Sequence, residues 1–168
     1  MSAVALADLG TAFPEAIDVV RLASGSPRRT LATAESCTGG MLGAAITAVP
    51  GSSQVYLGGL VVYSNWAKLA ELGVPSDLLD AAGAVSPQVA ASMAASVRLR
   101  LGATYGVGIT GVAGPGFSER KPAGLIHVGV AGPHRTVLRR LTHDQGRHAN
   151  RMGAVTAALE LLLDQLRE

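Results

Sequence analysis

The sequence predicts an α/β layered domain built on a mixed β-sheet, and three observations predict it. Strand-like apolar runs alternate along the chain with segments of helical periodicity, as in layered α/β domains. These runs are apolar on successive residues, which is typical of strands covered on both faces. Three strands follow one another late in the chain, which indicates a sheet that is not purely parallel. The 168 residues fit one domain, 1–168, with 1–11 expected as a loosely ordered N-terminal extension.

The first half of the chain is expected to contain four helices and two strands. Apolar residues at helical spacing mark the first helix, and Pro50-Gly51 ends the second. Gly73 and Gly83 follow the next two helices at the position that C-cap glycines usually take. The expected helices are 12–23, 38–47, 65–72 and 77–82, and the expected strands are 30–34 and 55–63.

The second half is expected to contain two helices and three strands. Ser86 is a typical N-cap residue and Pro87 suits the first helical position, so a longer helix is predicted to run to residue 101. Apolar strands are predicted at 105–110, 125–131 and 136–141, and an amphipathic helix at 147–166 closes the domain.

The composition excludes several classes of protein. Apolar residues make up 48% of the chain and charged residues 15%, which is typical of a globular protein and not of a disordered one. The single cysteine, Cys37, has no partner for an internal disulfide, which favours a reducing, cytoplasmic compartment. The net charge is only +2 and aromatics are 4%, so nucleic acid is not expected as a partner.

Membrane, metal and dinucleotide sites are not expected either. Residues 36–67 carry no charge, but glycines and Pro50 cut them into pieces shorter than a span of about 20 apolar residues. The histidine spacings fit no usual pair of metal ligands. Gly106, Gly108 and Gly111 spell GxGxxG, but they lie within a strand and Pro115 follows where a helix should begin. The sequence therefore predicts neither a metal nor a cofactor.

Polar residues and glycines gather directly after the first predicted strand, at 35–40. Ligands of open α/β sheets bind beyond the carboxyl ends of strands. A helix that begins near Thr38 would present unpaired N–H groups that suit a phosphate or an oxyanion. Alternatively, Thr38 only caps the helix and the glycines permit close packing.

Two further stretches also follow strands. Lys68 lies shortly after Tyr63, and a lysine desolvated among apolar groups loses its proton more readily and can act as a base. A serine paired with such a lysine is a known form of activated nucleophile; a lone lysine is otherwise a solvated surface residue. The glycine-rich loop 109–116 allows close approach to a ligand, or it is a long connection between strands.

Taken together, these stretches resemble the CinA C-terminal family of nicotinamide-mononucleotide amidases. The resemblance covers about 31–166 and rests on blocks in a fixed order: Thr33-Ala34-Glu35-Ser36-Cys37-Thr38-Gly39-Gly40, Val49-Pro50-Gly51-Ser52-Ser53, Tyr63-Ser64-Asn65 with Lys68, Gly83-Ala84-Val85-Ser86, Ile109-Thr110-Gly111-Val112-Ala113-Gly114-Pro115 and Lys121-Pro122-Ala123-Gly124.

The resemblance implies a three-layer α/β/α sandwich that hydrolyses the carboxamide of nicotinamide mononucleotide to nicotinic acid mononucleotide and ammonia, a step of NAD salvage. It implies a small pyridine mononucleotide as partner, no cofactor and a homodimer. Ser36 would be the nucleophile, Lys68 its base, and Tyr63 a proton relay or an orienting hydroxyl. Ser53 is the rival nucleophile.

The remaining site residues expected to bind substrate are Glu35, Thr38, Gly39, Gly40, Ser53, Thr110, Gly111, Ala113, Gly114 and Arg147. Among them, the amides of Gly39 and Gly40 would hold the oxyanion, and Arg147 would clamp the phosphate. The alternative function is a non-catalytic, pyridine-nucleotide-binding regulatory module of a competence/damage-inducible type.

Overall fold

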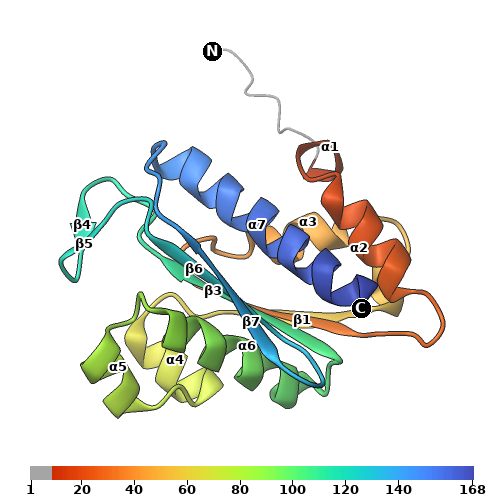
Figure 1. The fold of residues 1–168 in the computed structure, drawn as a ribbon, viewed down its shortest axis with the longest axis horizontal. Helices are drawn as coiled ribbons and strands as arrows, with labels where there is room; N and C mark the ends of the chain where they lie inside the picture. The colour runs from red at the N-terminus through yellow and green to blue at the C-terminus, as the bar shows by residue number, and fades with distance from the viewer. Residues whose placement is uncertain (1–8) are drawn as a thin grey trace.

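A five-stranded sheet forms the centre of the computed structural model, which describes residues 9–168 (Figure 1). Its strand order is β2-β1-β3-β6-β7. The strands are β1 (Leu31–Glu35), β2 (Tyr56–Val61), β3 (Tyr105–Gly111), β6 (Ile126–Ala131) and β7 (Thr136–Leu141). The pairs of β1 with β2 and β3 are parallel, and β6 and β7 join antiparallel. The predicted mixed sheet is therefore confirmed.

Helices cover both faces of this sheet, as Figure 1 shows. One face carries α2 (Glu15–Ala23), α3 (Met41–Thr47) and α7 (Arg147–Arg167), and the other carries α4 (Asn65–Leu72), α5 (Ser76–Ala82) and α6 (Pro87–Leu101). Each face has its own apolar cluster. The three-layer α/β/α fold expected from the resemblance is confirmed.

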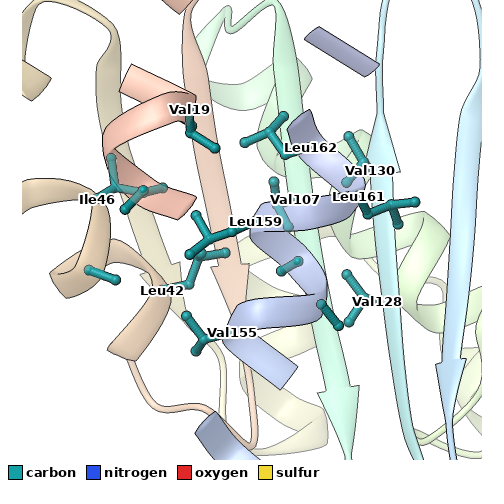
Figure 2. Packing of buried hydrophobic residues seen from close by; sticks show 14 of the residues in the cluster. Val19, Leu42, Ile46, Val107, Val128, Val130, Val155, Leu159, Leu161 and Leu162 are labelled. Carbon is teal, nitrogen blue, oxygen red and sulfur yellow. The ribbon is translucent and has the colours of Figure 1, made fainter. Parts of the chain in front are cut away.

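The larger cluster holds the helices of the first face on the sheet (Figure 2). Val19 of α2, Leu42 and Ile46 of α3, and Leu159 of α7 are all buried here, and they face Val107 of β3. Full burial of one such side chain contributes about 1.5–3 kcal/mol. The cluster therefore fixes β1 and β3, whose carboxyl ends carry the polar stretches described above.

Glycines allow α6 to lie unusually close to β3. A Cβ at Gly106 would lie 2.1 Å from the carbonyl oxygen of Ala94, and one at Gly108 would lie 2.4 Å from that of Ala90. Both distances are far shorter than any contact between non-bonded carbon and oxygen. The first two glycines of the GxGxxG pattern therefore serve the packing of a helix, whereas a Cβ at Gly111 would meet Ile126 of β6.

Most predicted boundaries agree with the structure within a few residues, and α4, α6 and β7 match their predicted ranges. The start of α3 was predicted wrongly: the helix begins at Met41, because Gly39 (φ 63°) and Gly40 (φ 95°) are left-handed. The predicted extension 1–11 is only partly described. Residues 1–8 lie outside the described residues, whereas Leu9–Ala12 forms the short helix α1, whose Leu9 packs against the core.

Three small elements were not predicted: α1, the 3-10 turn η1 (Ser52–Gln54) and a hairpin of β4 (Phe117–Ser118) with β5 (Lys121–Pro122). Within residues 9–168, no helix has the length and apolar character needed to cross a membrane. The same part of the chain holds no cluster of three His, Cys, Asp or Glu side chains placed to bind a metal.

Candidate active site

A cavity of about 240 Å³ lies where β1 and β3 end. Ser36 follows β1 directly, and Thr110 and Gly111 are the last residues of β3. Lys68 and Ser36 form its buried wall, whereas Tyr63 and Arg147 lie at its exposed side. The polar stretches that the sequence singled out after strands thus meet at one place.

The closest contact in this cavity joins Lys68 to Ser36. Lys68 Nζ lies 3.0 Å from Ser36 Oγ, and it also contacts the carbonyl oxygens of Val62 at 3.1 Å and Tyr63 at 3.4 Å. Lys68 is 2% exposed and Ser36 is 7% exposed. Ser64 caps α4 by accepting from an amide of its first turn, which places Lys68 just inside the helix and over the cavity.

Burial weakens the basicity of Lys68. Desolvation lowers the pKa of its amine, against the smaller opposing effects of Cys37 and Glu119. No carboxylate forms an ion pair with it among residues 9–168. A neutral amine has two N–H donors, which match the two carbonyl acceptors, and its lone pair can then accept the proton of Ser36. The geometry suits a lysine base.

Cys37 lies beside this pair but has the opposite chemistry. Burial raises the pKa of its thiol from 9.0 to about 11. The side chain is 6% exposed and lines the cavity. Because the thiolate is the reactive form of cysteine, this thiol is a weak nucleophile near neutral pH.

Glu35 caps α3 with its carboxylate. The two carboxylate oxygens accept from the amides of Gly40 (3.1 Å), Leu42 (3.0 Å) and Gly43 (2.8 Å). The side chain is 1% exposed and does not line the Ser36 cavity. The amides at the positive end of this helix are therefore occupied by the chain itself, and Glu35 positions the turn instead of touching a ligand.

Thr38, Gly39 and Gly40 also lie outside the lining of the cavity. The amide of Gly39 donates to the carbonyl of Ser36, and that of Gly40 donates to Glu35. The oxyanion role expected of these two amides does not fit, because both are already used. Thr38 is fully buried and caps no helix: its hydroxyl has no partner and its carbonyl accepts from Arg151.

The two candidate serines are separated. Ser53 is exposed in η1 and does not line the cavity, whereas Ser36 contacts Lys68. The glycine-rich loop lies where it was expected, since Thr110, Gly111, Ala113 and Gly114 all line the cavity. The hydroxyl of Thr110 donates to the carbonyl of Ala84 (2.7 Å), which ties β3 to the segment before α6.

Arg147 and Tyr63 meet at the exposed side. Arg147 donates to the carbonyl of Gly114 (2.7 Å) and to the hydroxyl of Tyr63 (3.3 Å). Tyr63 is 61% exposed, and its hydroxyl has no hydrogen bond to Ser36 or Lys68. The Tyr63 hydroxyl thus contacts Arg147, and a direct proton relay from it to the Ser36–Lys68 pair does not fit this geometry, whereas its orienting role stays a prediction.

Sequence reasoning missed the contribution of the β4–β5 hairpin. Phe117 and Glu119 line the cavity. Glu119 accepts from the amide of Ala84 (2.9 Å), and Lys121 donates to the carbonyls of Ala82 (2.7 Å) and Val85 (2.6 Å). The hairpin is thus fastened to the segment before α6. The Lys121-Pro122 block marks this segment in the sequence, but it does not indicate a hairpin.

A family model described as the CinA C-terminal domain matches residues 16–166. Two curated relatives, both named CinA-like protein, are 52% identical to this chain. The one from Frankia casuarinae matches over 133 residues, 79% of this chain and 31% of its own. The one from Desulfovibrio desulfuricans matches over 141 residues, 83% and 33%. The chain spans about a third of the length of these relatives.

Solved structures of similar proteins share the fold. A competence/damage inducible protein from Agrobacterium tumefaciens superposes with a TM-score of 0.84 at 37% identity, covering 93% of this chain and 98% of that one. A competence-damaged protein (CinA) superfamily member from Escherichia coli gives 0.88 at 30% identity, covering 98% and 95%. With its fold, its ordered motifs and the family match in agreement, the chain belongs to the CinA C-terminal domain family.

Proposed function

We propose that this chain is an amidohydrolase that converts nicotinamide mononucleotide to nicotinic acid mononucleotide and ammonia. The observation that carries the proposal is the 3.0 Å contact between buried Lys68 and Ser36. A structural lysine is rarely buried without a carboxylate partner, whereas a base needs that burial to lose its proton. The substrate is taken from the family resemblance, and the cavity supplies matching groups for both of its ends.

The reaction requires two displacements at the carboxamide carbon. Lys68 takes the proton of Ser36, whose Oγ attacks that carbon and forms a tetrahedral intermediate. The Lys68 ammonium then gives its proton to the departing nitrogen, which leaves as ammonia. Water, deprotonated by Lys68 in turn, attacks the acyl-serine ester; the Lys68 ammonium returns that proton to the departing Oγ of Ser36, and the acid product leaves as its carboxylate after losing its own proton to solvent. The carbonyls of Val62 and Tyr63 hold Nζ in place throughout.

The oxyanion and the phosphate need separate donors. The amide of Cys37 follows the nucleophile and belongs to a residue that lines the cavity, the position that supplies an oxyanion donor in other serine hydrolases. Arg147 has five N–H donors, and the chain uses two of them, on Gly114 and Tyr63. The others remain to bind a phosphate at the exposed side of the cavity.

Release of ammonia from nicotinamide mononucleotide tests this proposal directly. Ser36→Ala and Lys68→Ala are each expected to lower kcat at least ~100-fold, because each removes a partner in the proton transfer. Ser53→Ala is the matched control and should keep wild-type turnover. Unchanged turnover in both variants would eliminate the mechanism. Binding of the nucleotide by calorimetry without any product from the wild type would instead favour the non-catalytic module.

A further inference from the structure

A second cavity, of about 500 Å³, lies between the start of α6 and the strands β6 and β7. Val85 lines both this cavity and the one that holds Ser36, so the segment before α6 separates the two. The proposed hydrolysis uses no residue on the far side of Val85. The second cavity therefore needs an explanation of its own.

The walls of this cavity carry basic side chains and no acidic one. Lys121, His127, Arg139 and Arg140 line it, and no Asp or Glu does. Arg140 is exposed, and its side chain makes no hydrogen bond or ion pair within residues 9–168. Its neighbour Arg139 pairs with α7 on the opposite face of the sheet. Arg139 also borders the cavity, but its guanidinium is held by α7, and because side chains alternate along a strand Arg140 points to the face that carries His127.

His127 is the second unusual feature. It is 6% exposed and lines the cavity, and its imidazole makes no hydrogen bond to any residue in the described part of the chain. It lies directly opposite Arg140 in the β6–β7 ladder. Its ring nitrogens are not sealed from solvent, and because they have no protein partner a ligand that enters the cavity can bond to them. Its pKa is lowered by desolvation and by the nearby cations Arg140 and Lys121.

The start of α6 contributes to the same wall. Ser86, Pro87 and Gln88 line the cavity, and α6 is a helix of 15 residues whose positive end lies here. Ser86 already caps the helix by accepting from Val89, so the amide of Gln88 remains to face a ligand. Leu125 and Leu138 complete the walls with apolar surface. Anion-binding groups thus surround one end of an otherwise apolar space.

We propose that this second cavity binds a small organic carboxylate. Arg140, His127 and the start of α6 hold its carboxylate, and its apolar body packs against Leu125 and Leu138. The charge of the walls excludes a cationic ligand, and the leucines favour a carboxylate with an apolar body over a bare inorganic anion.

Titration of the ¹⁵N-labelled chain with benzoate, followed by NMR, tests the proposal. The amides of Gln88, His127 and Arg140 are expected to shift together. Arg140→Ala should weaken the Kd of benzoate at least ~10-fold, because a charge-assisted contact is lost. Arg135→Ala is the matched control, since Arg135 carries the same charge directly before the same strand and does not line the cavity, and it should leave the Kd within about twofold.

Two further probes separate charge from shape. Benzyl alcohol, which has the ring without the charge, and inorganic phosphate, which has the charge without the ring, are each expected to bind at least ~10-fold more weakly than benzoate. Equal binding of either probe would overturn the proposal. So would benzoate shifts confined to the Ser36 cavity, or an Arg140→Ala variant with the wild-type Kd. None of these results depends on whether the chain hydrolyses an amide.

Discussion

Replacing Glu35 with glutamine tests the inference that this carboxylate holds the turn on which Ser36 lies. The carboxylate accepts three amide hydrogen bonds, at 2.8, 3.0 and 3.1 Å, from the start of α3. Glutamine has one acceptor oxygen, and its NH₂ group would face amides that are themselves donors. At least one bond is lost, and a buried hydrogen bond to a charged group contributes about 1.5–3 kcal/mol.

We therefore expect Glu35→Gln to lower the free energy of unfolding by about 2–4 kcal/mol. For a domain of this size the Tm should fall by roughly 5–15 °C. Urea unfolding followed by circular dichroism measures the change. Glu71→Gln is the control: Glu71 is half exposed and lies 3.5 Å from Arg100, so its loss should cost less than about 1 kcal/mol. Equal losses in the two variants would refute the capping role of Glu35.

Three other substitutions or modifications test the packing and the buried groups. The free energy of unfolding of the wild type, relative to that of Lys68→Met, should rise with pH between the lowered pKa of Lys68 in the folded chain and its ordinary value of 10.5. In that window the unfolded chain holds a proton that the folded chain has lost. Urea unfolding measures the difference between the two proteins, and a difference that does not change with pH contradicts the prediction. Gly108→Ala should lower the free energy of unfolding by about 1–3 kcal/mol, since its Cβ would lie 2.4 Å from the Ala90 oxygen. Gly153→Ala is the control: its Cβ would enter open space in α7, so the change should stabilise the fold slightly. Cys37 should react with Ellman's reagent at least ~100-fold more slowly in the folded chain than in urea, because its pKa is about 11; equal rates would show an accessible thiolate.

The sequence predicts the elements well where local signals agree. Ser86 and Pro87 mark the start of α6, and the structure begins the helix there. The signals fail after β1: the polar run 35–40 resembles a helix start with free amides. The two left-handed glycines delay α3, and Glu35 reaches forward over five to eight residues to occupy those amides. Such a long-range cap has no short sequence signature.

The candidate site was predictable in its residues and only partly in their roles. Order along the chain indicates that Ser36 and Lys68 follow neighbouring strands, and their contact follows from the parallel pairing of β1 with β2. The contact of the Tyr63 hydroxyl depends on the direction of that side chain. The β4–β5 hairpin depends on a turn of two left-handed non-glycine residues, Glu119 and Arg120. Neither feature has a periodic pattern that sequence reasoning can detect.

The close packing of α6 on β3 restrains the strand whose last residues, Thr110 and Gly111, line the Ser36 cavity. With Ala90 and Ala94 already against the glycine backbone of β3, the helix has no space in which to slide along the strand. The side chains of Tyr63 and Phe117, which line the same cavity, are by contrast exposed. Ordering each of these two side chains around a ligand costs about 0.5–1.5 kcal/mol. The affinity of the cavity for a ligand therefore depends on how well the side chains at its exposed side are ordered before binding.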